Sequence, residues 1–116
     1  MILLLSFSLP ALADLIKLRC TLDPYAQVKM IEYDEATRTV NNATPKAESV
    51  CTSDTGNCWR ANVSDTEILV ETFEGGEVSL RQEVDRMTGH FVYSEFSGGK
   101  RTGQWTGTCV KFKQAF

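Results

Sequence analysis

The sequence lacks the features that mark several large functional classes. It has no dense cluster of lysine and arginine, and its formal net charge is −3, so the electrostatic footprint of a nucleic-acid-binding protein is missing. No glycine-rich loop precedes a helical pattern, which leaves nucleotide binding without support. After residue 13 no apolar run is long enough to cross a bilayer. We therefore expect no nucleic-acid partner, no cofactor and no membrane span.

Histidine is also scarce, and the single one lies in the stretch E83-V-D-R-M-T-G-H-F-V-Y-S-E-F96. Asp85, His90 and Ser94 would be the ingredients of a hydrolase. However, His90 and Ser94 are four residues apart on what reads as one strand, which separates them by about 13 Å. No nucleophile-elbow motif is present either. The stretch predicts a hairpin turn, and we expect the protein not to be an enzyme.

Residues 1–13 read MILLLSFSLPALA, an apolar run followed by the A-x-A pattern that signal peptidase accepts. This predicts an export signal cut between Ala13 and Asp14. The basic start of such a signal is missing, which indicates a truncated signal or a different start codon. The alternative, a hydrophobic first strand, is disfavoured because Pro10 interrupts the run. Residues 14–116 then form one domain in the periplasm or outside the cell.

Four cysteines in a small exported domain indicate two disulfides. We favour Cys51–Cys58, which closes a short polar loop, and therefore Cys20–Cys109, which ties the first strand to the last. In the loop-entropy model the long bridge contributes about 4–5 kcal/mol and the short one about 2–3 kcal/mol. The alternative is a zinc site. It is disfavoured because structural zinc sites use closely paired cysteines, and six residues separate even the nearest pair here. We expect no metal.

From Asp14 onward no stretch keeps a helical apolar period, whereas short alternating runs are separated by turn signals. The fold class predicted is all-β, a small antiparallel barrel or sandwich of about seven or eight strands stapled by the disulfides. The clearest expected strands are Leu15–Leu22, 26–33, 59–63, 67–73 and 104–112.

Three turns follow from local residues. E74-G-G-E77 suits a two-residue hairpin turn, and regular pairing from it places Glu71 opposite Leu80 and Leu69 opposite Gln82. D85-R-M-T-G89 has an acid that can accept backbone N–H bonds and a glycine for the left-handed position. D34-E-A-T-R38 repeats this pattern with arginine in place of the glycine.

Aromatic and charged residues suggest a surface for binding. The chain has more large aromatics than so small a core needs, which predicts that some are exposed. Stretch 48–77 carries seven acids and the single base Arg60. Paired acids could also serve a glycosidase, but that needs a cleft with defined carboxylate spacing, for which a domain of this size has little room. The candidate binding surface consists of Ser97, Gly98, Lys100, Arg101, Glu67 and Glu71.

The C-terminal third, V84-D-R-M-T-G-H-F91 followed by T106-G-T-C-V-K111, resembles the ending of small exported bacterial β-domain proteins whose function is not established. The resemblance covers about thirty residues, and its motifs are those of a hairpin and a disulfide. It implies a periplasmic or secreted β-domain and carries no activity with it.

In layout the chain is also similar to the periplasmic inhibitors of c-type lysozyme, which are small disulfide-bonded barrels that bind a basic enzyme. Their inhibitory loop carries S-G-x-x-Y, whereas here Ser97 and Gly98 are kept and Arg101 stands where the tyrosine belongs. We therefore expect a non-catalytic binding or accessory protein whose partner is an unknown protein or envelope ligand. The alternatives are an inhibitor of a basic cell-wall hydrolase and, third, a small hydrolase.

Overall fold

A computed structural model describes residues 15–45, 49–52 and 56–112, so the expected export signal, residues 1–13, lies outside the described residues. Within those residues no helix is long and apolar enough to span a membrane. The secondary structure consists of eight strands: β1 (Leu15–Leu22), β2 (Gln27–Asp34), β3 (Thr39–Ala43), β4 (Cys58–Val63), β5 (Glu67–Glu74), β6 (Glu77–Asp85), β7 (His90–Ser97) and β8 (Lys100–Phe112).

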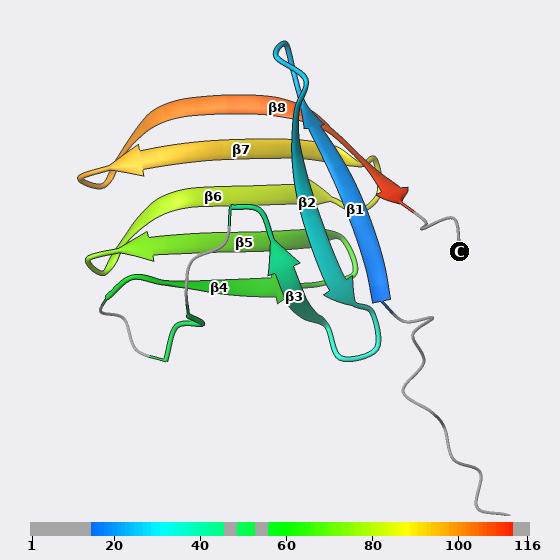
Figure 1. The fold of residues 1–116 in the computed structure, drawn as a ribbon, viewed down its shortest axis with the longest axis horizontal. Helices are drawn as coiled ribbons and strands as arrows, with labels where there is room; N and C mark the ends of the chain where they lie inside the picture. Colours follow the sequence, from blue (N-terminus) through cyan, green and yellow to red (C-terminus); the bar gives the residue numbers. More distant parts are fainter. Residues whose placement is uncertain (1–14, 46–48, 53–55, 113–116) are drawn as a thin grey trace, which may run out of the picture.

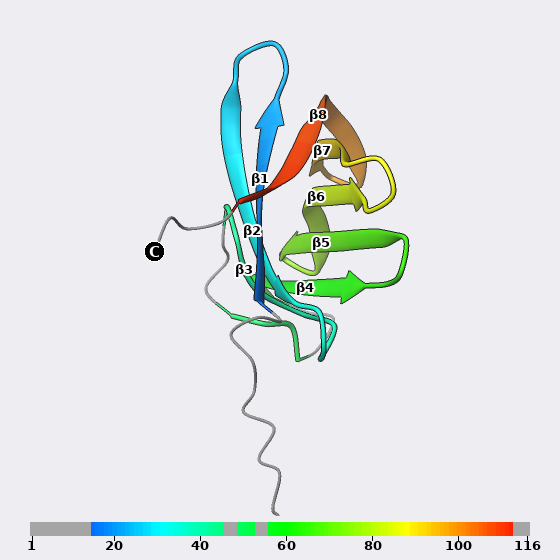
Figure 2. The same ribbon diagram turned by 90° about the vertical axis from the view of Figure 1, so that its right-hand side faces the viewer.

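The strands form one antiparallel sheet in the order β3-β2-β1-β8-β7-β6-β5-β4, which curls into a nearly closed barrel. The all-β prediction is confirmed. Figure 1 shows β4–β8 stacked as one layer, with β1–β3 crossing it steeply. Figure 2, turned by 90°, shows the two layers facing each other, with β8 bending from one into the other. Because β8 is 13 residues long, it pairs with β7 along its first part and with β1 along its last.

The seam between β1 and β8 joins the two ends of the domain. Cys20 lies directly opposite Cys109 in the register, and the two are disulfide-bonded. The second bridge is Cys51–Cys58, so both predicted disulfides are confirmed. Bonding the first strand to the last removes two sheet edges that would otherwise be open to other chains.

Of the two remaining edges, β3 and β4, the edge of β4 is covered by the segment that precedes it. The N–H of Cys51 donates to the carbonyl of Trp59 at 2.7 Å, and the N–H of Trp59 donates to the carbonyl of Ser49 at 2.9 Å. Val50 therefore pairs with Trp59 in parallel. The Cys51–Cys58 disulfide holds this segment against β4. The sequence did not predict that the segment would pair with a strand.

The core lies between the two layers and is built from inward-facing apolar side chains. Its fully buried members include Phe91, Ile31, Ile68 and Val70. On β1, Leu18, Cys20 and Leu22 are buried together, whereas Arg19 is exposed. The other buried members of this core cluster are Tyr33, Val40, Ala43, Trp59, Val63, Leu80, Val84, Tyr93 and Cys109.

The two acid-led turns have the same geometry. Oδ1 of Asp85 accepts from the N–H groups of Met87 and Thr88, and Gly89 closes the turn with φ of 80°. Oδ1 of Asp34 accepts in the same way from Ala36 and Thr37. Arg38 takes the left-handed position with φ of 59°, which an L residue occupies only at a cost. Both turn predictions are confirmed, including the one with arginine in the glycine position.

The pairing predicted for the β5–β6 hairpin is correct only next to its turn. Phe73 lies opposite Val78 as expected, but the register then shifts by one residue, so that Thr72 faces Leu80 and Glu71 faces Arg81. Ser79 is the extra residue of a β-bulge. A bulge moves every later side chain to a new partner. The predicted pairs Glu71–Leu80 and Leu69–Gln82 are therefore wrong, and Leu69 faces Glu83.

Candidate functional site

The two ends of the barrel are built differently. One end, here called the tied end, gathers the turns at 34–38, 64–66 and 85–89. The other, here called the open end, carries the glycine turns at 75–76 and 98–99. The contrast matters because a small barrel offers a ligand site where its mouth is left open.

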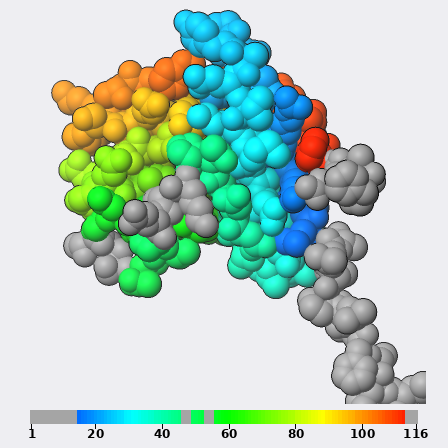
Figure 3. All heavy atoms as spheres, viewed as in Figure 1, coloured from blue at the N-terminus to red at the C-terminus, as the bar shows by residue number. Residues whose placement is uncertain are grey.

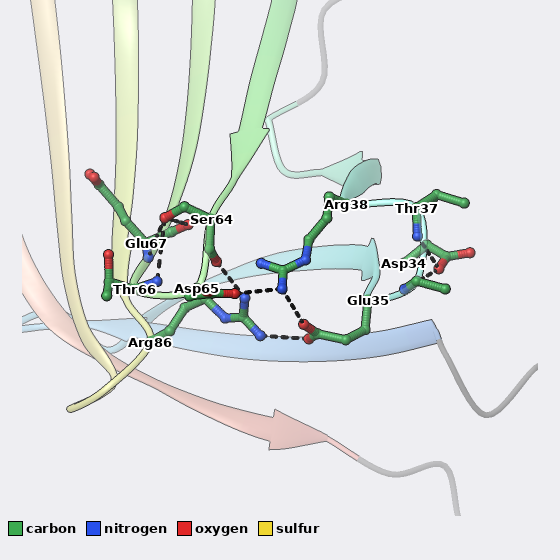
Figure 4. A network of polar contacts seen from close by, with 10 residues as sticks. Asp34, Glu35, Thr37, Arg38, Ser64, Asp65, Thr66, Glu67 and Arg86 are labelled. Carbon is green, nitrogen blue, oxygen red and sulfur yellow. Dashed lines mark hydrogen bonds and ion pairs between the residues drawn. The ribbon is translucent and has the colours of Figure 1, made fainter.

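Arginine side chains cross-link the tied end (Figure 4). Nη2 of Arg86 contacts Oε2 of Glu35 at 2.5 Å, and Nη1 of Arg86 donates to the carbonyl oxygen of Ser64. Nη2 of Arg38 contacts Oδ1 of Asp65 at 2.5 Å. The network joins the turn of the β1–β3 layer to two turns of the other layer. It therefore holds the layers together at this end.

These contacts lower the pKa values of both carboxyls. The hydrogen bond from Arg86 lowers the pKa of Glu35 below its ordinary value of 4.5, and the hydrogen bond from Arg38 lowers the pKa of Asp65 below 3.8. In turn, the hydrogen bond to Glu35 raises the pKa of Arg86. A depressed carboxyl pKa adds stability above the unfolded-state pKa, and this is lost as the pH falls through the folded-state value.

We expect Glu35→Gln to lower stability near neutral pH, by up to about 1 kcal/mol because the pair is partly exposed and screened by solvent. The deficit should shrink as the pH falls below 4.5, the ordinary Glu35 value, and vanish below the lower folded-state pKa. Thermal unfolding across this pH range measures the deficit, with Glu67→Gln at the start of β5 as the control. A deficit that is independent of pH would contradict an ionic role for Glu35.

At the open end the strands β5–β8 extend past the β1–β3 layer, as the space-filling view shows (Figure 3). Their inner face there is hollowed into a groove of about 770 Å³. Leu80 and Tyr93 line its buried part, and Glu95 pairs with Leu80 in the register. The described residues that line the groove are Pro45, Asn57, Thr72, Phe73, Glu74, Ser79, Leu80, Tyr93, Glu95, Phe96, Ser97 and Thr102.

A smaller pocket of about 260 Å³ adjoins the groove and shares Tyr93 and Glu95 with it. Its other aromatic members are Trp105, whose ring lies edge-on to Tyr93 at 6.1 Å, and Tyr25, which is 76% exposed. The ammonium of Lys29 lies 5.0 Å from the centre of the Tyr93 ring. Burial, followed by the nearby Glu95 charge, raises the pKa of the Tyr93 phenol, which therefore stays protonated and can donate a hydrogen bond.

Gln82 is the inward neighbour of Tyr93 across the β6–β7 ladder, directly behind the groove wall. It is 0% exposed, and neither Nε2 nor Oε1 finds a hydrogen-bond partner among the described residues. A buried amide without partners lowers the stability of the fold. Here an uncompensated polar group is paired across the ladder with Tyr93, a residue that lines the groove.

We expect Gln82→Met to raise the free energy of unfolding by about 1–3 kcal/mol, because methionine fills similar space without an unpaired amide. Chemical denaturation measures the change. Gln104→Met, on an exposed position of β8, serves as the matched control and should be neutral. A loss of stability in Gln82→Met would mean that the amide is hydrogen-bonded in solution.

On the outer face of the β4–β7 layer, a nearly buried glutamate forms ion pairs with two arginines. Glu71 is only 7% exposed and lies between two guanidinium groups, with Oε1 3.5 Å from Arg60 and Oε2 3.2 Å from Arg81. Those guanidinium groups also cover the rings of Phe73 and Phe96. The Glu71 carboxylate is thus occupied within the chain.

The structure does not bring the predicted binding surface together. Ser97, Gly98, Lys100 and Arg101 are all exposed at the β7–β8 turn of the open end, where Ser97 lines the groove. Glu67 is exposed at the start of β5, next to the 64–66 turn of the tied end. Glu71 lies on the outer face between them. Only the turn residues therefore lie beside the groove.

The sequence indicated neither metal nor catalytic chemistry. All four cysteines are in disulfides, so none is a free thiolate. Among the described residues no three His, Cys, Asp or Glu side chains are grouped as metal ligands. His90 and Ser94 both lie on β7, which keeps them about 13 Å apart along the strand.

The binding surface predicted from the sequence did not include the groove residues Tyr93, Glu95 and Phe96. One signal could have found part of the site. Phe91, Tyr93 and Glu95 alternate on the inner face of β7, and an acid at an inward position of a strand indicates that the face is open to solvent there.

The comparison of this chain with family models, with curated proteins and with solved structures finds no significant match in any of the three.

Proposed function

We propose that the chain is an exported, non-catalytic binding protein that takes its ligand into the groove at the open end. The groove itself carries this proposal. Its volume of about 770 Å³ falls within the range of about 300–1,000 Å³ that is usual for small-molecule sites. Aromatic rings and a few polar groups line it, which is the composition expected of such a site. Two disulfides are typical of proteins from an oxidising compartment and support a periplasmic or secreted location.

A groove-filling variant tests the proposal. We expect wild-type protein, incubated with an extract of envelope small molecules, to retain a ligand that native mass spectrometry detects. Thr102→Trp places an indole at the groove wall on an exposed position, and it should abolish the retention. Thr106→Trp is an equally exposed change on the same strand outside the groove and should leave retention intact. Equal retention by all three proteins would place the ligand elsewhere and overturn the proposal.

The inhibitor alternative would use either the acidic stretch 48–77 or the exposed β7–β8 turn, which projects at the open end. Lys100 and Arg101 in this turn would repel a basic enzyme, so the groove is the stronger candidate. An inhibition assay with c-type lysozyme separates the two proposals. For the hydrolase alternative, a screen of ester and glycoside substrates is repeated with His90→Ala. Activity that is lost in that variant would overturn the non-catalytic proposal.

A further inference from the structure

The charge of the groove points to the kind of ligand that it would take. Glu74 and Glu95 are exposed carboxylates in its lining, while the described lining residues include no lysine, arginine or histidine. The other polar lining groups are neutral hydroxyls and the amide of Asn57. Carboxylates in a partly enclosed groove create a negative potential that concentrates cations and disfavours anions. The lining of the groove is therefore complementary to positive charge, while the basic side chains of Lys100 and Arg101 lie outside it on the exposed β7–β8 turn.

The aromatic rings of the site add a second attraction for a cation. An ammonium or guanidinium within about 6 Å of a ring centre is attracted by the negative face of the ring. Tyr93 already binds such a group, because the ammonium of Lys29 lies 5.0 Å from its centre in the adjoining pocket. Phe73 and Phe96 also line the groove, and one face of each ring is already covered by the guanidinium group of Arg60 or Arg81. A cation with an apolar body would therefore contact both the carboxylates and the aromatic rings of the site.

Trp105 extends this surface into the adjoining pocket. Its ring lies against Gly103, where an added Cβ would come 2.5 Å from the ring, so glycine is what lets the indole lie flat. The ring is half-buried and lines the pocket beside Tyr93 and Glu95. Together with Tyr25, it gives the pocket three aromatic side chains next to one carboxylate.

We infer that the ligand of the groove is a small organic cation, namely an amine carried on an apolar or aromatic body. The inference rests on the groove being the binding site proposed above. Small size follows from the groove volume, and charge follows from Glu74 and Glu95. The position over the Tyr93 ring is already occupied by the ammonium of Lys29, a positive group that the chain itself supplies.

Three probes with a common aromatic body separate charge from shape: phenethylamine, 2-phenylethanol and phenylacetate. Isothermal titration calorimetry should give phenethylamine the tightest binding, with a dissociation constant of about 1 mM or below. We expect 2-phenylethanol to bind about tenfold more weakly and phenylacetate the most weakly. Added salt should weaken phenethylamine binding and leave 2-phenylethanol unaffected.

Charge-neutralising variants locate the effect. Glu95→Gln and Glu74→Gln should each weaken phenethylamine binding by about threefold to tenfold, the range expected for a partly exposed charge pair. Neither should change 2-phenylethanol binding. Glu67→Gln removes the same charge near the tied end and should change neither probe. Both groove glutamates are exposed, so these variants should keep the fold, as circular dichroism would check.

The outcomes separate this inference from the proposed function. If 2-phenylethanol binds as tightly as phenethylamine and Thr102→Trp abolishes both, the groove is a binding site but not one for cations. If phenethylamine binding survives in Thr102→Trp, Glu74→Gln and Glu95→Gln alike, both proposals fail. If wild-type protein binds none of the three probes, the cation inference is overturned, and retention of extract ligands decides the proposed function alone.

Discussion

Replacing Cys20 and Cys109 together by alanine should lower the free energy of unfolding by about 4–5 kcal/mol. The bridge joins residues that are 89 positions apart, and a loop of that length loses much conformational entropy when it is closed in the unfolded chain. Net stabilities of small domains are only about 5–15 kcal/mol. We therefore expect the variant to be partly unfolded at physiological temperature. Urea denaturation at several temperatures measures the loss.

The second bridge provides the matched control. Cys51 and Cys58 are seven positions apart, so their double replacement by alanine should cost only about 2–3 kcal/mol. This change frees the segment that covers the edge of β4, whereas the long bridge ties β1 to β8. Equal losses in the two variants would contradict the entropic argument. A loss below about 1 kcal/mol for the long bridge would mean that the β1–β8 ladder alone holds the chain ends together.

Local residues were sufficient to predict most of the architecture. The Asp34 and Asp85 turns could be predicted because an acid at the first position satisfies backbone N–H groups two and three residues on. The disulfide pairing followed because Cys51 and Cys58 are close in sequence, which left Cys20 for Cys109. Each of these features depends on residues that are near one another in the chain, or on simple elimination.

Register was the first property that local reasoning could not supply. Nothing in the residues around Ser79 distinguishes a bulge from continuous pairing, because the bulge depends on how β5 and β6 twist against their neighbours. β3 was missed as a regular strand for a similar reason. Its sequence, TVNNA, is rich in residues typical of loops. It forms a strand because it pairs with β2, which no local pattern indicates.

The open and tied ends could not be predicted either, because they arise from the path of the sheet. Arg86 and Glu35 are 51 residues apart, and they meet only because the two layers cross. The groove exists because β5–β8 extend beyond the β1–β3 layer, which depends on the length and bend of β8. Such features are set by sheet curvature and not by the pattern of one strand.

The second large effect should come from Gly107→Ala, which tests how closely β8 approaches β1. A Cβ at Gly107 would lie 1.8 Å from the carbonyl oxygen of Thr21 and 2.9 Å from Cα of Leu22. Both neighbours are backbone atoms, so no side-chain rotation relieves the clash. We expect a loss of about 3 kcal/mol, at the upper end of the usual overpacking range. For a domain of this size that corresponds to a fall in melting temperature of about 10 °C or more.

Gly98→Ala separates this crowding from the general cost of removing a glycine. Gly98 lies in the β7–β8 turn with φ of 58°, and an added Cβ there would meet nothing within 4 Å. Its replacement should cost about 1–2 kcal/mol, the penalty of a left-handed L residue, and should leave the β1–β8 seam intact. Hydrogen exchange then distinguishes the two variants, because only Gly107→Ala should expose the amides of β1 and the end of β8. Protection of the seam that stays at the wild-type level in Gly107→Ala would show that β1 and β8 can separate slightly without losing their pairing.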